Sequence, residues 1–328
     1  MFAVVLVGGF GTRLRPLTNE IPKPMLPVLH RPMITRLVER LEQGGVTDVV
    51  LALGFKPEPF QSAFPESVHN SVRIHYAVEP EPLDTAGAIA FAARAAGVDD
   101  TFVVANGDII TSLSIGDLVA AHRRADAAAT LHLIPVDDPS AYGVVEVDDA
   151  RIRRFVEKPA PGESDSNLIN AGTYVFEPGV LDLIPPLERW SVERAVFPEI
   201  ASRGDLAGYA TDDEWLDAGR PEAYLGVNVD LARRHPDEAV HPSALVRPGA
   251  VIVDSVIGPD VVVGAGATVV SSLLFGHATV AADATVERSV VMGSVGIGAT
   301  VTDSVIGERH RVSAGDRVDG ARLPETVS

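Results

Sequence analysis

The chain of 328 residues contains no cysteine, and it is also short of aromatic and basic side chains. Without cysteine there is no disulfide framework and no thiolate-ligated metal site. No run approaches the ~20 apolar residues that a membrane-spanning helix needs, so no membrane span is expected. The 27 Lys and Arg against 45 Asp and Glu give a net charge of −18. That balance argues against a nucleic-acid-binding protein, because such proteins present a basic surface.

Apolar residues, by contrast, are plentiful. They make up 46% of the chain and charged residues only 22%, which at this length is ample for two packed domains. No basic and apolar leader precedes the first apolar run, and the lack of cysteine suits a reducing compartment. A cytoplasmic location is therefore expected.

The stretch from Val4 to Pro27 reads VVLVGGFGTRLRPLTNEIPKPMLP. Its apolar run predicts a buried strand, and three glycines follow within four positions, namely Gly8, Gly9 and Gly11. Glycines let the backbone turn sharply and bring its N–H groups close to a ligand. Arg13 and Lys23 on the same loop carry the charges that bind phosphate. The stretch therefore predicts a polyphosphate cradle directly after the first strand.

Two well-known phosphate loops do not fit this stretch. A Walker-type loop needs G-x-x-x-x-G-K-[ST], and no Lys-Ser or Lys-Thr pair follows these glycines. A dinucleotide fingerprint needs G-x-G-x-x-G, and Leu14 stands where its third glycine should be.

From residue 1 to about 230, expected strands alternate with expected helices. The strands are predicted at Val4–Val7, Val46–Leu53, Val72–Val78, Thr101–Ala105, Ala127–Pro135, Ala171–Phe176 and Leu206–Ala210. Helices are predicted to start at Pro32, at Asp84 or Thr85, at Ser114 and at Ser191. A hairpin is predicted from Val144–Val147 and Ile152–Val156. This alternation predicts an α/β, Rossmann-like, mostly parallel sheet with both faces covered.

After about residue 240 the apolar period becomes six. The apolar positions are Ile257, Val263, Val269, Phe275, Val291, Ile297, Ile306, Val312 and Val318. A six-residue repeat predicts a left-handed parallel β-helix with these side chains stacked inside, and ordinary antiparallel strands are the alternative. The chain thus divides into a catalytic domain, 1–235, and a β-helix domain, 236–328. The flat faces and open ends of such a solenoid favour a homo-oligomer.

Polar candidates follow several predicted strands. In open α/β sheets the active site lies outside the carboxyl ends of the strands, and Asp108, Glu157, Lys158 and Asn170 are expected there. Asp217 lies in a turn beyond the last predicted strand. Two loop carboxylates, Asp108 and Asp217, could hold one Mg²⁺, which typically takes one or two carboxylates plus substrate phosphates. Singly, each residue also suits an ordinary turn or a solvated surface.

The motifs taken together resemble a known family. The string G-G-x-G-T-R-L-x-P-L-T-x-x-x-P-K-P resembles the signature of the sugar-1-phosphate nucleotidylyltransferases in every defined position. V-E-K-P, N-A-G-x-Y-V-F and W-x-D-A-G follow in the family's order. The segment from Glu79 to Gly87 resembles the nucleobase loop E-x-x-P-L-G-T-A-G of the mannose-1-phosphate guanylyltransferases, with Asp84 in place of the middle glycine.

This resemblance implies a role for each candidate. Arg13 and Lys23 would be catalytic and neutralise charge on the α-phosphoryl group and the leaving pyrophosphate. The implied nucleotide-binding residues are Gly8, Gly9, Gly11, Thr12, Glu79, Thr85 and Gly87. The implied sugar-phosphate-binding residues are Gly143, Glu157, Lys158, Asn170 and Gly172. Asp108 and Asp217 would hold Mg²⁺.

The expected reaction is nucleotidylyl transfer from a nucleoside triphosphate, with GTP favoured, to a sugar 1-phosphate, most simply mannose 1-phosphate giving GDP-mannose. A sugar 1-phosphate is already an anionic nucleophile, so the protein has to align two polyanions and stabilise charge. The absence of a Ser-His-Asp or Cys-His set agrees with that chemistry. The alternatives are glucose 1-phosphate with UTP, dTTP or ATP, a non-catalytic regulatory subunit, and a bifunctional enzyme whose β-helix, with His277 or His310, transfers acyl groups.

Overall fold

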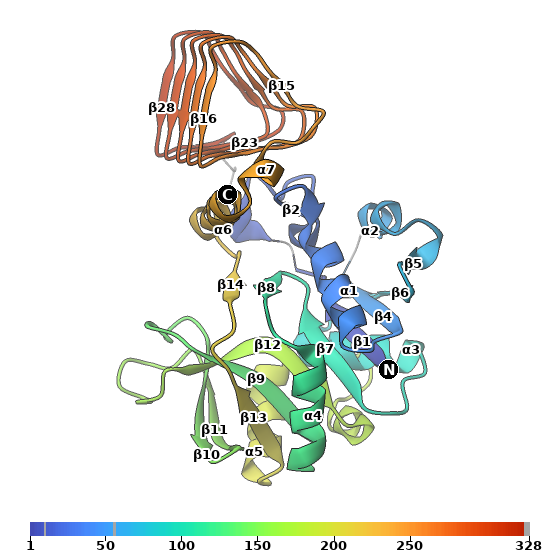
Figure 1. The fold of residues 1–328 in the computed structure, drawn as a ribbon. Coiled ribbons are helices and arrows are strands. Elements are labelled where there is room, and N and C mark those ends of the chain that lie inside the picture. Colours follow the sequence, from blue (N-terminus) through green and yellow to red (C-terminus); the bar gives the residue numbers. More distant parts are fainter. Residues whose placement is uncertain (10, 55–56, 325–328) are drawn as a thin grey trace. The chain divides into compact units, whose positions relative to one another are not determined.

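The computed structural model describes residues 1–9, 11–54 and 57–324, and they form two compact units (Figure 1). The first unit comprises Met1–Gly9 and Ile34–Trp215, and the second comprises residues 11–33 and 216–324. The predicted phosphate loop is therefore shared between them, and its Phe10 lies outside the described residues. Among the described residues, no helix is both long and apolar enough to cross a membrane.

The first unit is built on a ten-stranded sheet with the order β10-β11-β13-β9-β12-β7-β1-β4-β6-β5. Its strands are β1 (Phe2–Leu6), β4 (Asp48–Leu53), β5 (Val68–His69), β6 (Val72–Val78), β7 (Phe102–Asn106), β9 (Ala129–Pro135), β10 (Gly143–Asp148), β11 (Arg151–Glu157), β12 (Leu168–Phe176) and β13 (Leu206–Ala210). Parallel pairs join β1 to β4 and β7, β4 to β6, and β9 to β13. The predicted α/β sheet is confirmed.

One strand in the middle of this sheet runs the other way. β12 is antiparallel to both of its neighbours, β7 and β9. The chain reaches β12 from the hairpin of β10 and β11, which is confirmed as predicted, and no helix intervenes. A parallel neighbour would need a crossover connection, so a strand entered from a hairpin can pair antiparallel.

Helices cover the sheet on both faces. They are α1 (Met33–Gln43), α2 (Glu58–Ala63), α3 (Asp84–Ala95), α4 (Ile115–Ala125), the π-helical turn η5 (Val192–Val196) and α5 (Phe197–Ser202), with short 3₁₀ turns η3 (Pro65–Ser67) and η4 (Pro178–Leu183). The main core joins α3, η5 and α5 to one face of the sheet, with Ile89, Phe176 and Phe197 fully buried. On the other face, α4 packs against β9 and β13.

Two of the predicted helix caps are confirmed and one is wrong. Ser114 Oγ accepts from Asp117 N at 3.3 Å, and Ser191 Oγ accepts from Arg194 N at 3.2 Å. The cap predicted at Asp84 or Thr85 is instead Leu83, which makes no side-chain cap. Ala86 N and Gly87 N instead donate to Trp190 O at 2.8 and 3.1 Å, so a tertiary contact satisfies the start of α3 without a side-chain cap.

The second unit contains a β-helix of three parallel sheets, seen as stacked triangular coils in Figure 1. The first sheet has β15 (Leu245–Val246), β18 (Val262–Val263), β21 (Thr279–Val280), β24 (Ser294–Val295) and β27 (Arg311–Val312). The second has β16 (Val251–Val253), β19 (Thr268–Val270), β22 (Thr285–Glu287), β25 (Thr300–Thr302) and β28 (Arg317–Asp319). The third has β17 (Val256–Ile257), β20 (Leu273–Leu274), β23 (Val290–Val291), β26 (Val305–Ile306) and β29 (Arg322–Leu323). This is consistent with the predicted left-handed β-helix, and the antiparallel alternative is wrong.

The strict six-residue period predicted the wrong inward-facing residue at two positions. Ile297 is 61% exposed, and Val295 stacks inside in its place. Phe275 is buried, but Leu274 holds the stacking position. In the third sheet, successive partners are 17 residues apart, and Val291 and Ile306 only 15 apart. A coil therefore has fewer residues than three full hexads, so a strict six-residue count goes out of step with the inward positions.

Buried serines join successive coils. Ser272 N donates to Ser255 Oγ at 3.0 Å, and Ser289 N donates to Ser272 Oγ at 3.1 Å. Ser304 N repeats the bond to Ser289 Oγ at 3.0 Å. Each hydroxyl also donates to the carbonyl two residues earlier. The ladder satisfies polar groups that the tight corner would otherwise leave buried and unpaired.

In the rest of the second unit, the segment that follows the phosphate loop packs against α6 (Pro221–Arg234). This part contains η1 (Thr12–Leu14), η2 (Lys23–Met25), β2 (Pro27–Val28), β3 (Arg31–Pro32) and α7 (Pro236–Ala239). Leu29 N donates to Asn228 Oδ1 at 2.8 Å, and Tyr224 OH donates to Pro27 O at 2.5 Å. The Tyr224 ring also contacts the Phe275 ring, with centroids 6.4 Å apart. That contact explains why Phe275 faces outward from the coil.

Candidate active site

Gly8 and Gly9 follow the carboxyl end of β1 in the first unit. A Cβ on Gly8 would lie 2.9 Å from Gly54 N and 3.4 Å from Glu79 Oε1. The ends of β1, β4 and β6 therefore meet at a point that only glycine can occupy. Among the described residues, a Cβ on Gly9 would meet nothing within 4 Å, so packing against them does not explain this glycine.

Glu79 follows β6 and is buried. Its Oε2 accepts from Leu83 N at 2.8 Å, which closes the 79–83 loop. Burial raises the pKa of the Glu79 carboxyl, and the bond from Leu83 N partly opposes that rise. The carboxylate thus stabilises the backbone of the 79–83 loop through this hydrogen bond.

Thr85 and Gly87 attach the start of α3 to residues 188–193. Thr85 Oγ1 donates to Glu193 Oε2 at 2.7 Å and accepts from Val192 N at 2.9 Å. A Cβ on Gly87 would lie 2.5 Å from Glu188 O. The close approach of this backbone accounts for the glycine.

Asp84, which departs from the glycine of the resembled nucleobase loop, has φ of 61°. This left-handed conformation favours glycine, and Asp is one of the few other residues that adopt it. Its Oδ1 accepts from Thr85 N at 2.8 Å. The substitution therefore keeps the backbone conformation for which glycine is suited.

Gly143, Glu157 and Lys158 come together at the end of the β10–β11 hairpin. Gly143 pairs with Glu157, and a Cβ on Gly143 would lie 3.0 Å from Glu157 Oε2. The pKa of Glu157 is raised by burial and then by the charge of Glu193, while Lys158 lowers it. Lys158 Nζ lies 3.6 Å from Glu157 Oε1.

Asn170 and Gly172 form an irregular step in β12, where the register to β9 shifts. Gly172 N donates to Asn170 Oδ1 at 3.0 Å, and Asn170 Nδ2 donates to Tyr174 OH at 3.0 Å. Gly172 has φ of 77°, and a Cβ there would lie 2.6 Å from Asn106 Nδ2. The irregularity begins after Asn170, which still pairs with Leu133, and it places Gly172 in a left-handed conformation that favours glycine.

Asp108 follows β7 directly. Gly107 N donates to Leu6 O at 2.9 Å, so the turn that carries Asp108 sits beside the end of β1. The pKa of the buried Tyr174 is raised by burial first, then by the charges of Glu193, Glu157 and Asp108. The charges of three carboxylates therefore act on one buried phenol.

In the second unit, Arg13, Lys23 and Asp217 converge. Lys23 Nζ lies 3.4 Å from Asp217 Oδ1, and the lysine side chain is only 7% exposed. A Cβ on Gly219 would lie 2.8 Å from Asp217 Oδ1 and 3.2 Å from Arg13 Nη2. The Arg13 guanidinium and the Asp217 carboxylate thus border the backbone at Gly219, and Lys23 lies beside that carboxylate.

Gly11 and Thr12 set the backbone before Arg13. Gly11 has φ of 57°, and its carbonyl accepts from Thr18 Oγ1 at 2.7 Å. A Cβ at Gly11 would lie 3.3 Å from Lys23 Cβ. Thr12 opens η1 immediately after this left-handed residue. The conformation of Gly11 thereby brings the Arg13 and Lys23 segments together.

The two units hold different parts of the predicted site. The first has Asp108 and the predicted base and sugar residues, and the second has Asp217 with the two cations. Among the described residues, no group of three or more His, Cys, Asp or Glu side chains could hold a metal ion by itself. Two carboxylates completed by phosphate oxygens are the donor set that suits Mg²⁺.

Sequence reasoning missed Glu193, Tyr174 and Gly219 as parts of this site. Tyr174 and Gly219 lie inside motifs already identified, N-A-G-x-Y-V-F and W-x-D-A-G. Glu193 had no motif, because its importance comes from contacts with Thr85 and Glu157, far away in the sequence.

Comparison with known proteins identifies the family of this chain. The family described as nucleotidyl transferase matches residues 2–234, and the GMPPB C-terminal domain matches residues 235–326. A mannose-1-phosphate guanylyltransferase of Mycobacterium tuberculosis is 39% identical over 78% of this chain and 74% of its own length. A mannose-1-phosphate guanyltransferase of Schizosaccharomyces pombe is 41% identical over 77% of this chain and 71% of its own.

Solved structures show the same relationship. A putative glucose-1-phosphate thymidylyltransferase from Bacillus anthracis, in complex with sucrose, matches with a TM-score of 0.64 and 28% identity, over 71% of this chain and 96% of its own. HddC from Yersinia pseudotuberculosis complexed with GMP-PN matches with a TM-score of 0.60 and 28% identity, over 70% and 99%. The chain therefore belongs to the nucleotidyl transferase family, as an enzyme of sugar-phosphate nucleotidyl transfer that carries a GMPPB-type C-terminal domain.

Proposed function

We propose that this enzyme transfers guanylyl from GTP to mannose 1-phosphate in a Mg²⁺-dependent reaction that yields GDP-mannose and pyrophosphate. The observation that carries the proposal is the convergence of Arg13, Lys23 and Asp217 in a chain about 40% identical to proteins named mannose-1-phosphate guanylyltransferase. The neighbouring structure with bound GMP-PN supports a guanine nucleotide.

In the proposed mechanism the glycine N–H groups at Gly8, Gly9 and Gly11 hold the triphosphate, with Thr12 beside them. Arg13 and Lys23 stabilise charge on the α-phosphoryl group and on the leaving pyrophosphate. Thr85 and Gly87 hold the base in the loop that begins at Glu79.

The sugar phosphate binds at the β10–β12 edge. Lys158 meets its phosphate, Glu157 and Asn170 form hydrogen bonds with its hydroxyls, and Gly143 and Gly172 contact it through their backbones. No general base is required, because the attacking phosphate oxygen is already anionic. Alignment of the two substrates supplies most of the rate enhancement.

Asp108 and Asp217 would hold Mg²⁺ together with substrate phosphates. The donor set fits, since hard carboxylate oxygens suit this ion and phosphate oxygens complete its shell. When bound, the ion supplies charge neutralisation and a template for the two polyanions.

Glucose 1-phosphate with dTTP is the second candidate, because one structural neighbour is named a putative glucose-1-phosphate thymidylyltransferase. Base and sugar are each chosen by a few contacts in a shared pocket, so one fold accommodates both pairs.

The test is pyrophosphate release with GTP, ATP, UTP, CTP and dTTP, each against mannose 1-phosphate and glucose 1-phosphate. We expect GTP with mannose 1-phosphate to give the highest kcat/KM, and EDTA to abolish turnover until Mg²⁺ is added back. If dTTP or UTP exceeded GTP by about tenfold, which corresponds to 1.4 kcal/mol, the guanylyl assignment would be wrong. Full turnover in EDTA would overturn the role of the metal.

A further inference from the structure

The last described strand of the β-helix contacts the phosphate loop directly. Arg322 in β29 uses both ends of its guanidinium: Nη1 donates to Arg13 O at 3.2 Å, and Nη2 donates to Glu222 Oε1 at 2.9 Å. Glu222 lies in the first turn of α6. One planar side chain therefore links the coil, the helix and the backbone of Arg13.

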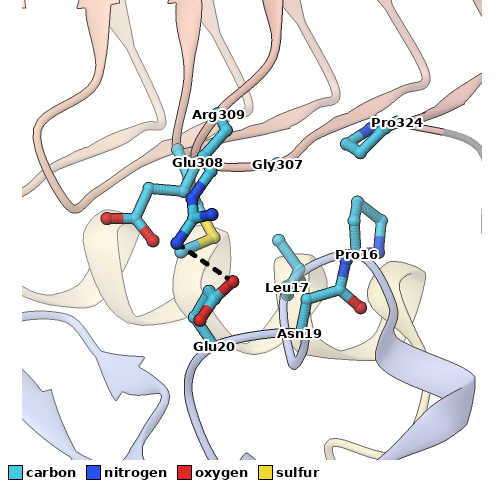
Figure 2. A pocket seen from close by; sticks show the side chains of 9 residues that line it. Pro16, Leu17, Asn19, Glu20, Gly307, Glu308, Arg309 and Pro324 are labelled. Carbon is cyan, nitrogen blue, oxygen red and sulfur yellow. Dashed lines mark ion pairs between the residues drawn. The ribbon is translucent and has the colours of Figure 1, made fainter.

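The loop also meets the coil elsewhere. Arg309 Nη2 lies 3.3 Å from Glu20 Oε1, shown as a dashed line in Figure 2. A Cβ on Gly307 would lie 3.1 Å from Pro16 Cβ. Between these contacts remains a cavity of about 160 Å³, and its lining includes Leu17 and Met292 (Figure 2). An ion pair and a close approach at Gly307 thus flank the cavity between this side of the loop and the β-helix.

We propose that Arg322 is a positioning residue for Arg13. By fixing the Arg13 carbonyl it sets the direction in which the Arg13 guanidinium leaves the backbone, toward Asp217 and the triphosphate. The β-helix would then contribute to turnover through this contact. The inference rests on the proposed function only for the role of Arg13 at the triphosphate.

The contact suits positioning better than stability. The side chain of Arg322 is 48% exposed and that of Glu222 is 71% exposed. Ion pairs between exposed groups add little to folding stability. A small displacement of a charge-stabilising group, by contrast, has a large effect on rate. The fork geometry matters too, since a guanidinium holds two acceptors in fixed directions and an ammonium does not.

The test compares Arg322→Gln and Arg322→Lys with Arg317→Gln, a control at an exposed arginine in β28 of the same coil. For Arg322→Gln we expect kcat to fall about tenfold while the KM for the sugar 1-phosphate changes less than about twofold. Arg322→Lys should recover part of the loss, and Arg317→Gln should match the unmodified enzyme. Melting temperatures of all three should stay within about 2 °C of the unmodified enzyme.

An unchanged kcat in a folded Arg322→Gln enzyme would overturn the inference, as would an equal loss in Arg317→Gln. If Arg322→Gln unfolds, Glu222→Gln provides the test instead. This change weakens the bond between the Arg322 guanidinium and α6, and we expect kcat to fall about threefold. A normal kcat there would count against positioning. Arg13→Lys separates the positioning role of Arg322 from the catalytic role of Arg13. Normal turnover in Arg13→Lys would refute the catalytic role of Arg13 itself.

Discussion

At the scale of single residues, the most informative position in the site carries no side chain. Arg13, Lys23 and Asp217 come from separate parts of the sequence, and the backbone at Gly219 runs past two of them. The glycine in W-x-D-A-G therefore has a packing reason: a methyl group would occupy space that the carboxylate and the guanidinium use.

Gly219→Ala should accordingly lower turnover without unfolding the protein. The new Cβ would lie 2.8 Å from Asp217 Oδ1 and 3.2 Å from Arg13 Nη2, so both groups must move. We expect kcat to fall at least about tenfold. The matched control is Gly226→Ala, where a Cβ meets nothing within 4 Å. Being inside α6, that change should stabilise the fold by about 0.5–1 kcal/mol and leave turnover unchanged.

A second residue-scale prediction concerns His132 in β9. Burial lowers the pKa of His132 to about 4, although Asp213, with Oδ2 3.8 Å from Nε2, acts to raise it. The folded state thus favours neutral histidine, whereas the unfolded chain titrates near about 6.5. This stabilisation is complete above about pH 6.5 and is lost as the pH falls toward 4, by about 3 kcal/mol in total.

Urea unfolding at several pH values between 4 and 7 checks this expectation. In His132→Gln the acid-dependent loss over this window should become smaller than in the unmodified protein. His277→Gln, at an exposed position in the β-helix, should keep the original pH dependence. Identical slopes in all three proteins would show that His132 does not titrate as described.

At the scale of elements, the β-helix depends on its serine ladder as well as on its apolar stack. Each buried hydroxyl in the ladder accepts one backbone N–H from the next coil and donates to a carbonyl in its own coil. Such a group is satisfied only while the coils remain in register. The ladder therefore joins successive coils at the corner between the second and third sheets.

Ser272→Ala should destabilise the protein because Ser289 N would lose its acceptor in a buried place. The expected cost is about 1–3 kcal/mol, from leaving a buried donor unsatisfied. Ser313→Ala, at an exposed position, should change stability by less than about 0.5 kcal/mol. Chemical denaturation of both variants makes the comparison, and equal midpoints would argue against the ladder.

At the scale of the whole molecule, the two compact units do not follow the order of the chain. Residues 11–33 lie near the amino terminus, yet they form one unit with residues 216–324. Tyr224 shows why, because its hydroxyl bonds to Pro27 O while its ring meets Phe275. The loop that carries Arg13 and Lys23 is thus built into the unit that contains the β-helix.

Ending the chain after Arg234 should therefore damage the active site as well as remove the β-helix. The truncated protein would lack Phe275, Arg309 and Arg322, all of which contact α6 or the phosphate loop. We expect kcat to fall further than in Arg322→Gln. Size-exclusion chromatography and pyrophosphate release measure the outcome, and a monodisperse truncated protein with full turnover would contradict it.

The sequence by itself determined the alternation of strands and helices, the change of period near residue 240 and the family. Each of these is a local pattern: a glycine-rich turn after an apolar run, a serine before a helix, or an apolar side chain every sixth position. Such patterns act on neighbouring residues, so they can be recognised without the fold.

Only the tertiary structure decided which distant residues meet. It reversed β12, placed Val295 inside the coil in place of Ile297, and brought Glu193 to Thr85 and Arg322 to Arg13. The reason is physical: strand direction, coil length and long-range contacts are set by the packing of the whole unit. Local sequence carries almost no trace of them.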